Sequence, residues 1–506
     1  MSGRVLNRRE FLEAAGTTAI LGFCARAGLG RQSTTRRKPN FVFFLIDDLG
    51  WKDLGCYGST FYETPNIDRL AAQSVRFTNA YAACPVCSPT RASIMTGKHP
   101  ARLGITDWIG APQTPTGYRE HLPLEEGTVA EALKEVGYAT GYVGKWHLST
   151  RDADRAKYYP DRQGFDINVG GDHSGSPPSY FHPYSKGNRS LETMPAGGRD
   201  GEYLTDRLTD ESLKFIEASR DRPFLLYLAH YGVHTPLESK KELAERYQAK
   251  AKGLPEHEGP RAEKVYGPYA TRLVQDHAVY AGMIQSVDDS VGRVLDKLQA
   301  LELEQDTIVI FMSDNGGLST VGREGPTCNL PLRAGKGWLY EGGIREPMLI
   351  KWPGVAKSGS VCHESVVSMD FYPTMLEMAG LALKPEQHVD GVSLVPLLRG
   401  AGTAKRDALY WHYPHYHGSG NRPSGAVRAG DYKLIEWYED GKVELYNLKD
   451  DLSERNDLAV KMSAKADELK RMLHAWRIEV GAKMPQGKPR DDFQVWRRAR
   501  DGKDNP

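Results

Sequence analysis

The fold of this chain is restricted most strongly by four short apolar segments that each stop abruptly at polar residues. They are rich in β-branched and aromatic side chains, and continuous apolar runs of this length are typical of strands buried on both faces of a sheet. The four segments are residues 41–46, followed by Asp47 and Asp48; residues 138–143, followed by Lys145 and His147; residues 223–228, followed by His230 and His234; and residues 307–312, followed by Asp314 and Asn315.

Helical patterns separate these predicted strands, at residues 67–73, 128–136, 207–218 and 280–301. This alternation of strand and helix predicts an α/β fold with a large, mostly parallel sheet sandwiched by helices. Such folds bind ligands at the carboxyl ends of their strands. All four polar clusters are therefore expected at one edge of the sheet, where they would form a single site.

Beyond about residue 385 the pattern changes to short strand-like segments. They lie at residues 408–412, 426–428, 432–438 and 443–448, and Asp440-Gly441 is typical of a two-residue hairpin turn. Apolar residues then recur at helical spacing, namely Met462, Ala466, Leu469, Leu473 and Trp476. The sequence predicts a large domain over residues 28–385, a C-terminal subdomain over 386–487 with a smaller antiparallel sheet plus a helix, and a polar tail over 488–506.

Charge and hydropathy exclude two classes of partner. Lys and Arg number 66 against 65 Asp and Glu, and no stretch interleaves basic with aromatic residues as a nucleic-acid groove does. After the first 27 residues, no apolar run approaches the roughly 20 residues that a membrane-spanning helix needs. We therefore expect no nucleic-acid partner and no stable insertion into a membrane.

The N-terminus is typical of a twin-arginine export signal. Two arginines at residues 8–9 precede an apolar run over residues 14–25, and the small-residue cleavage pattern follows at residues 25–27. An ordinary amphipathic helix is the alternative, whereas a lipid anchor at Cys24 is disfavoured by the bulky residue before it. We predict that residues 1–27 are a signal peptide, that the twin-arginine translocon exports the folded chain, and that the mature protein is periplasmic or secreted.

The segment over residues 84–97, Cys-Pro-Val-Cys-Ser-Pro-Thr-Arg-Ala-Ser-Ile-Met-Thr-Gly, places one reactive side chain at the start of a short helix. Pro89 suits the first turn of a helix, and Gly97 suits the left-handed position that ends one. Cys87 would therefore face the positive pole of a helix start, where an anion is stabilised. Arg91 falls one turn later on the same face, where its guanidinium can hold a charged residue. A small buried thiol before a capped helix is the alternative.

This segment resembles the signature of the formylglycine-dependent sulfatases, Cys-x-Pro-x-Arg followed by Thr-Gly, which are the type I sulfatases of the alkaline phosphatase superfamily. Thr90 stands where many members carry Ser, and it keeps the hydroxyl. The resemblance continues through residues 50–58, 64–70, 144–147 and 335–347. It implies an arylsulfatase-like, exported bacterial sulfuric ester hydrolase with residues 28–385 as its catalytic domain. A formylglycine-generating enzyme would oxidise Cys87 to the aldehyde 3-oxoalanine (formylglycine).

Two pairs of residues at the predicted strand ends offer oxygen ligands to a hard divalent cation, namely Asp47 with Asp48 and Asp314 with Asn315. Taken singly, either pair is also a common turn. Together with Cys87 they match the metal set of the sulfatases position by position. The resemblance therefore implies a bound calcium ion, with magnesium as the second choice.

The resemblance also implies how the remaining residues act. Lys145, His234 and Lys336 would bind the sulfate group, and His147 would lie beside the formylglycine. A hydrated aldehyde has two hydroxyls: one attacks sulfur, and the other, deprotonated by a base such as His147, expels sulfate and regenerates the aldehyde. His234 would then be placed to protonate the departing alcohol.

Substrate identity is less restricted than reaction type. Candidate specificity residues lie in two loops, with Asp172 and His173 in one and His412, His415 and His417 in the other. Histidines bind hydroxyls and neighbouring aromatics stack on sugars, which favours a sulfated sugar as substrate; rigid structural loops are the alternative. Two other functions stay open, namely hydrolysis of phosphate monoesters or phosphonate esters on the same scaffold, and glycan binding by a pseudoenzyme whose Cys87 is never oxidised.

Overall fold

The structure of the protein is a computed structural model that describes residues 38–111 and 118–485. The predicted signal peptide over residues 1–27 and the predicted tail over 488–506 lie outside the described residues. Residues 39–111 and 118–485 belong to one compact unit. Within the described ranges, no helix is both long and apolar enough to cross a membrane.

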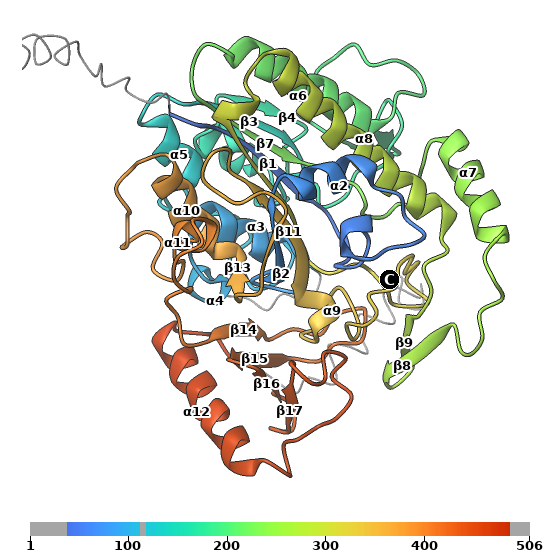
Figure 1. Cartoon of the computed structure of the whole chain (residues 1–506), viewed down its shortest axis with the longest axis vertical. Helices are drawn as coiled ribbons and strands as arrows, with labels where there is room; N and C mark the ends of the chain where they lie inside the picture. Colours follow the sequence, from blue (N-terminus) through green and yellow to red (C-terminus); the bar gives the residue numbers. More distant parts are fainter. Residues whose placement is uncertain (1–37, 112–117, 486–506) are drawn as a thin grey trace, which may run out of the picture. The chain divides into compact units, whose positions relative to one another are not determined.

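A mixed sheet of nine strands runs through the described part of the chain (Figure 1). The strand order is β12-β2-β11-β10-β1-β7-β3-β4, and β13 also pairs with β2. Strands β10, β1, β7, β3 and β4 are parallel to one another, whereas β11 is antiparallel to both of its neighbours. The strands are β1 (Asn40–Ile46), β2 (Val75–Tyr81), β3 (Ala139–Gly144), β4 (Ile167–Val169), β7 (Phe224–Ala229), β10 (Thr307–Ser313), β11 (Arg345–Lys351), β12 (Ser360–Cys362) and β13 (Val366–Val367). The predicted large, mostly parallel sheet is confirmed.

The four predicted strands are present as β1, β3, β7 and β10, whereas β2 and β11 were not predicted. β2 mixes buried with half-buried side chains, so it lacks a continuous apolar run. β11 is buried along its whole length but carries Arg345, Glu346 and Lys351. Both strands therefore differ from the apolar runs that identified the centre of the sheet.

Helices cover both faces of the sheet (Figure 1), which explains why its central strands are apolar throughout. All seven residues of β1 are buried, and alternate side chains of a strand point to opposite faces. Phe41 and Phe43 pack with α3, α5 and α10, while Val42 and Phe44 pack with α2, α6 and α8. Full burial of each such side chain contributes on the order of 1.5–3 kcal/mol. These helices are α2 (Pro65–Ala72), α3 (Cys87–Thr96), α5 (Val129–Lys134), α6 (Leu204–Ser219), α8 (Ala278–Ala300) and α10 (Phe371–Met378).

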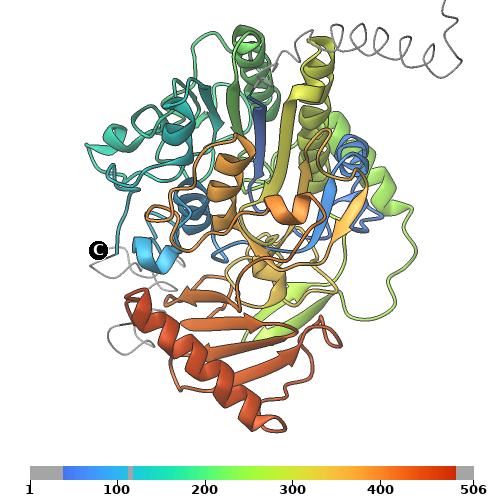
Figure 2. The same ribbon diagram turned by 60° about the vertical axis from the view of Figure 1, so that its left-hand side comes forward.

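The C-terminal part is a four-stranded antiparallel sheet with one helix across a face (Figure 2), as predicted. Leu469 of the helix packs on Val427 of the sheet, and Trp411 on the opposite face packs in the same cluster as Trp338. Gly441 has a φ of 66° in the hairpin turn, a conformation that favours glycine. The elements are β14 (Leu409–Tyr413), β15 (Ser424–Ala429), β16 (Tyr432–Trp437), β17 (Val443–Asn447) and α12 (Ser463–Glu479).

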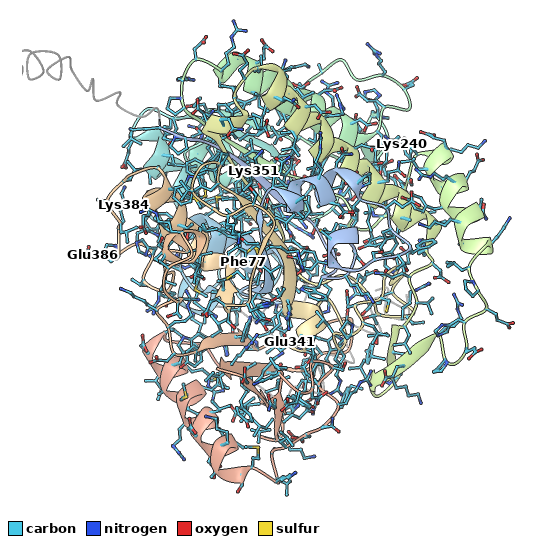
Figure 3. All side chains as sticks on the ribbon, in the orientation of Figure 1. Phe77, Lys240, Glu341, Lys351, Lys384 and Glu386 are labelled. Atoms are coloured by element: carbon cyan, nitrogen blue, oxygen red, sulfur yellow. The ribbon has the colours of Figure 1, made fainter. Side chains whose placement is uncertain are left out.

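Shorter elements connect the two sheets and line the surface. Glu341, labelled in Figure 3, begins α9 and contacts Lys433 of β16 at the junction of the two sheets (2.9 Å). The remaining α-helices in the described ranges are α4 (Pro100–Leu103), α7 (Lys241–Lys252), α9 (Glu341–Ile344) and α11 (Val395–Leu398). The 3-10 helices there are η1 (Gly55–Tyr57), η2 (Arg155–Tyr158), η3 (Pro160–Arg162), η4 (Glu304–Asp306) and η5 (Ser368–Asp370). Two hairpins pair β5 (Ser185–Lys186) with β6 (Arg189–Ser190) and β8 (Ala262–Tyr266) with β9 (Tyr269–Arg272).

Candidate active site

The polar clusters that follow the parallel strands meet at one edge of the large sheet. β1 lies between β10 and β7, and β3 pairs with the far side of β7. The residues directly after β1, β3 and β10 are Asp47, Lys145 and Asp314. Contacts among these three and their neighbours define the site, as expected for the carboxyl edge of an α/β sheet.

Helix α3 brings Cys87 to this edge. Val86 precedes the helix in an extended conformation, and Gly97 ends it with a φ of 69°. Every residue of α3 is buried, and Cys87 is 2% exposed. Burial, partly offset by Lys145 and Lys336, raises the pKa of the Cys87 thiol. The unmodified side chain is therefore a protonated thiol.

His147 contacts Cys87, and a backbone carbonyl defines its tautomer. Nε2–H of His147 donates to the carbonyl of Ile109 (3.0 Å), so Nδ1 carries the lone pair that faces the Cys87 Sγ at 3.3 Å. Burial, with Lys145 adding to it, lowers the pKa of His147 well below its usual range, so the ring is neutral. His147 also has a φ of 53°, a left-handed conformation that costs about 1–3 kcal/mol in a non-glycine residue. Its basic nitrogen is thus held toward position 87.

Asp47 and Asp48 follow β1, and each contacts one ammonium group. Nζ of Lys145 donates to Asp47 (2.7 Å), and Nζ of Lys336 donates to Asp48 (2.8 Å); all four side chains are buried. Burial, partly offset by Lys145, raises the pKa of Asp47 to about 8. Burial also acts to raise the pKa of Asp48, but Lys336 and His234 outweigh it and hold that pKa below its usual range.

Asp314 and Asn315 follow β10, the neighbour of β1. Nε of Arg91 donates to Oδ2 of Asp314 (2.9 Å), and the backbone N–H of Asp48 donates to its Oδ1 (3.2 Å). The side-chain amide of Asn315 donates to Oδ1 of Asp48 (2.8 Å). Arg91 also donates to the carbonyl of Lys145 (2.6 Å). One guanidinium therefore ties α3 to the ends of β3 and β10.

The acidic residues of this edge fit a divalent cation. The buried Oδ1 atoms of Asp47 and Asn315 have no hydrogen-bond partner among the described residues. Ligand atoms of Asp47, Asp48 and His234 lie within 4.8 Å of one another. Buried acceptors cost free energy unless something binds them, and hard cations prefer carboxylate and amide oxygens. Asp47, Asp48 and Asn315 thus offer oxygen ligands to such an ion, and Asp314 lies beside Asp48; the set of all four as its ligands stays a prediction.

The side chains of the site balance in charge. Three carboxylates meet three cationic groups here, namely Asp47, Asp48 and Asp314 with Arg91, Lys145 and Lys336. With all six groups ionised these charges cancel. A bound dication, which favours the ionised form of Asp47 despite its raised pKa, would then give the site a net positive charge. A buried site with that charge favours an anionic substrate.

His234, which follows β7, points its Nε2 into the site. Its Nδ1–H donates to the carbonyl of Thr235 (2.7 Å), and Nε2 lies 3.7 Å from Oδ2 of Asp48. Burial and then the ammonium of Lys336 lower the pKa of His234 to about 3. His230, by contrast, bonds through Nε2 to the hydroxyl of Ser290 on α8 (2.9 Å), so its ring contacts α8.

In the first predicted specificity loop, Asp172 is held by backbone groups. Its carboxylate accepts hydrogen bonds from the N–H groups of Ser174 (2.6 Å) and Glu192 (2.7 Å), and its carbonyl accepts from the N–H of His147 (3.2 Å). Asp172 therefore holds the backbone next to His147. His173 is half-buried beside it. Substrate binding by these two residues stays a prediction.

In the second loop, His412 and His415 are buried and bonded to groups of the protein. His412 bonds to the hydroxyl of Tyr438 (2.8 Å) and donates to the carbonyl of Lys483 (2.9 Å). His415 bonds to the hydroxyl of Thr106 (2.8 Å). Burial lowers the pKa of each histidine to about 3.

His417 lies on the side of the site that carries Lys336. It packs on Gly337, where a Cβ atom would lie 1.9 Å from the Nδ1 of His417. Gly337 directly follows Lys336, and burial, then Arg323 and Lys336, lower the pKa of His417 well below its usual range. Of the three histidines predicted in this loop, His417 is the one whose electrostatic neighbours include Lys336 and Asp48.

Two contacts that hold His147 were not predicted. The hydroxyl of Ser88 donates to the carbonyl of His147 (2.9 Å) and accepts from the N–H of Ile109 (3.0 Å). Ser88 lies inside the Cys87 motif, which is the signal that could have identified it. Ile109 acts through its backbone carbonyl and N–H groups. Because almost every residue has these groups, the sequence gives no signal for this contact.

The edge therefore presents a side chain at a helix start, a neutral base beside it, cationic groups and a set of oxygen ligands. This arrangement suits attack on the ester of a tetrahedral oxyanion. The fold and the site therefore define a hydrolase of such esters.

Comparison with known proteins identifies the family. The sulfatase family model matches residues 39–381, and the model described as N-sulphoglucosamine sulphohydrolase, C-terminal, matches residues 334–480. Dog N-acetylgalactosamine-6-sulfatase is 32% identical, with 84% of this chain and 76% of that protein covered. Human arylsulfatase A is 36% identical, with 78% and 74% covered. The crystal structure of Ps i-CgsB in complex with k-i-k-neocarrahexaose has a TM-score of 0.72 at 29% identity, covering 91% of this chain and 97% of that one.

The chain belongs to the sulfatase family, as a type I sulfatase, and is a sulfuric ester hydrolase.

Proposed function

We propose that this enzyme removes sulfate from sulfated carbohydrates, with a formylglycine made from Cys87 as its nucleophile. The observation that carries the proposal is the contact between position 87 and the neutral ring of His147. It lies at the sheet edge where Lys145 and Lys336 meet the acidic residues. Nucleophile, base and anion-binding groups are therefore within reach of one substrate group.

The proposal includes two groups that the standard amino acids do not supply, a divalent metal ion and a formylglycine. Calcium, or magnesium as second choice, would be held by Asp47, Asp48, Asp314 and Asn315 and would supply positive charge against the negative charge that develops on sulfate oxygens. Formylglycine at position 87 would supply, once hydrated, two hydroxyls in place of one thiol. The raised pKa of the Cys87 thiol supports the need for this change, because a protonated thiol is a weak nucleophile.

Residues of the chain would carry out the remaining steps, which are proton transfer and stabilisation of negative charge. The Nδ1 lone pair of His147 faces position 87 and can accept a proton from a hydroxyl there. The ammonium groups of Lys145 and Lys336 are buried beside the acidic residues, where they can stabilise charge on the outer oxygens of a sulfate ester. Nε2 of His234 faces the same space. For His234 to protonate the departing alcohol, Nε2 must first take up a proton, because Nδ1 carries the ring proton that is donated to Thr235.

Sulfated sugars are favoured as substrates by two relatives. One is named N-acetylgalactosamine-6-sulfatase, and the other was solved with k-i-k-neocarrahexaose bound. The position of His417 next to Gly337 adds a ring that can bind sugar hydroxyls near the sulfate. We therefore extend the proposal to the loops of Asp172, His173, His412, His415 and His417 as those that select the sugar. His173 and His417 would contact the sugar, whereas Asp172, His412 and His415, which bond to groups of the protein, would hold the loops in shape.

Mass spectrometry of the peptide over residues 84–91 tests the nucleophile. Protein made in a host with a formylglycine-generating enzyme should show the mass of the aldehyde at position 87 and an unmodified thiol at Cys84. The same preparation should release sulfate from a panel of sulfated mono- and oligosaccharides. An unmodified Cys87 in a fully active preparation would contradict the nucleophile, and turnover of aryl sulfates without any sugar sulfate would contradict the substrate class.

Phosphate monoesters and phosphonate esters are the second candidate substrates, because phosphate is also a tetrahedral anion. Matched aryl sulfate and aryl phosphate esters separate the two. We expect a higher kcat/KM for the sulfate, because the site holds an equal number of carboxylates and cations and so has limited excess charge for a dianion. A higher kcat/KM for the phosphate would reverse the assignment.

We also propose how the chain is made and located. Residues 1–27 would direct export by the twin-arginine translocon to the periplasm or the medium. Oxidation of Cys87 by the formylglycine-generating enzyme would come first, since this route carries folded proteins. Residues 28–385 would be the catalytic domain, residues 386–487 the C-terminal subdomain and residues 488–506 a polar tail.

A further inference from the structure

Two arginines without an assigned role, Arg151 and Arg189, contact the two loops that flank His147, and we call them the basic rim. The guanidinium carbon of Arg151 lies 5.8 Å from the ring centre of Trp108. Arg151 also packs on Gly110, where a Cβ atom would lie 2.3 Å from its Nε. Between these two contacts in the sequence is Ile109, whose carbonyl orients the imidazole beside position 87. The first half of the rim is thus built onto the segment that positions the base.

The second half of the rim is attached to another loop at the same imidazole. The guanidinium of Arg189, on β6, donates to the carbonyl of Ser176 (3.5 Å). The preceding residue, Gly175, packs on His147, since a Cβ atom there would lie 2.4 Å from the imidazole Cε1. Two separate loops therefore bring one guanidinium each to the surroundings of His147.

The charges of the rim are not neutralised by ion pairs. Within residues 38–111 and 118–485, neither Arg151 nor Arg189 forms an ion pair, and both are exposed to solvent. Burial of part of the side chain and then the charge of Arg189 lower the pKa of Arg151, while Glu120 acts in the opposite direction from beyond ion-pair distance. Like charges held near each other in this way are stabilised when an anion binds between them.

We propose that Arg151 and Arg189 form a second anion-binding subsite, which takes a sulfate or carboxylate on the sugar next to the one that carries the scissile sulfate. Trp108 would offer that sugar an apolar surface. The guanidinium fork binds the paired oxygens of either acidic group. The enzyme would therefore prefer oligosaccharides with an acidic group on the neighbouring sugar, an inference that rests on the proposed function.

Binding to a protein that cannot turn over tests the subsite directly. In the Cys87→Ala background, calorimetry compares a disaccharide with one sulfate, the same disaccharide with a second sulfate on the neighbouring sugar, and one with a carboxylate there. We expect at least about tenfold tighter binding of both doubly acidic sugars. Adding Arg151→Ala and Arg189→Ala should reduce this preference to near one. Arg162→Ala is the matched control, because its exposed guanidinium pairs with Asp161 (3.3 Å) elsewhere on the surface, and it should keep the preference.

Turnover by the otherwise native enzyme separates the subsite from the proposed function. The ratio of kcat/KM for the doubly acidic to the singly sulfated sugar should fall at least about tenfold in the Arg151→Ala/Arg189→Ala variant. An equal preference in the presence and absence of the two arginines would overturn the subsite. A preference in the binding experiment without turnover of any sugar sulfate would leave the subsite standing and overturn the proposed substrate class.

Discussion

Two buried charge clusters in this protein are built from similar residues but are completed differently. The site cluster joins Asp47, Asp48 and Asp314 to Arg91, Lys145 and Lys336. The junction cluster lies between the two sheets, where Lys433 contacts Glu341 and Glu454 (2.9 Å each) and Arg345 contacts Glu341 (3.2 Å); Figure 3 labels Glu341.

The two clusters differ in whether their acceptor atoms all have hydrogen-bond partners. In the junction cluster, the carboxylate oxygens of Glu341 and Glu454 accept hydrogen bonds from Lys433, Tyr81, Arg345 and a backbone N–H. In the site cluster, acceptor atoms of Asp47 and Asn315 lack partners among the described residues, and Asp48 and His147 have left-handed backbones. A completed cluster holds two parts of the fold together, whereas an incomplete and strained one is prepared for a ligand.

The largest effect is expected from Cys87→Ala, which should remove activity while hardly changing stability. The variant should lose at least about 10⁴-fold in turnover, the order found when an enzyme loses its nucleophile. Its free energy of unfolding should change by about 1 kcal/mol or less, because one small side chain is shortened. Sulfate release and chemical denaturation measure the two effects. Cys84→Ala, three residues earlier and equally buried, is the control and should keep its turnover. Turnover near the native rate by Cys87→Ala would remove position 87 from the mechanism.

Lys433→Met should lower stability and leave turnover unchanged, the reverse of what is expected for Cys87→Ala. It leaves Glu341 and Glu454 buried without their shared partner, which costs on the order of 3–5 kcal/mol of stability. Turnover per folded molecule should stay at the native value, because the site cluster is untouched. Urea denaturation followed by fluorescence measures the loss, and Lys442→Met, whose side chain is 77% exposed, should change stability by about 0.5 kcal/mol or less. A cost below about 1 kcal/mol would show that the junction cluster is not structural.

Stability should fall as the pH falls, through His99 at the junction with the C-terminal subdomain. Nε2–H of His99 donates to the carbonyl of Tyr410, Nδ1 accepts from Ala101, and burial lowers its pKa from 6.5 to about 4. The folded state thus binds the proton less tightly than the unfolded state. Stability from His99 is complete above pH 6.5 and decreases as the pH falls toward about 4, by up to about 3 kcal/mol.

Chemical denaturation at a series of pH values measures this dependence. His99→Gln should be less sensitive to pH across that range than the native protein. His257→Gln changes an exposed histidine and should leave the profile as it is. An identical profile for His99→Gln and the native protein would mean that His99 does not couple stability to pH.

The smallest effect is expected from Asn315→Ala. Removing one oxygen ligand should weaken calcium binding on the order of 10–100-fold, the range found when groups that orient a metal site are removed. Calcium titration of chelator-treated protein measures the affinity, and Asn447→Ala on β17 is the control. Native affinity in Asn315→Ala would mean that the partnerless oxygen of Asn315 serves another purpose.

The large sheet and the site edge could be predicted because their signals are local. The segments at residues 41–46 and 307–312 are apolar without interruption, and strands buried on both faces need that composition. β2 and β11 could not be predicted in the same way, because charged and polar residues in them are neutralised by partners far along the chain. Lys351 of β11, for example, is paired with Glu304, 47 residues earlier in the chain (2.7 Å).

Residue type and spacing alone were sufficient for the four strand ends with the polar residues that follow them and for the helix that starts at Cys87, whereas the role of Lys336 was inferred from the resemblance to sulfatases. These follow from period, capping and side-chain chemistry, which act over a few residues. Three-dimensional packing alone decided the tautomer of His147, the two acceptors without partners, the different surroundings of His412 and His417, and the approach of Arg151 to Arg189. Each of these depends on atoms distant in sequence, and only the folded chain brings such atoms together.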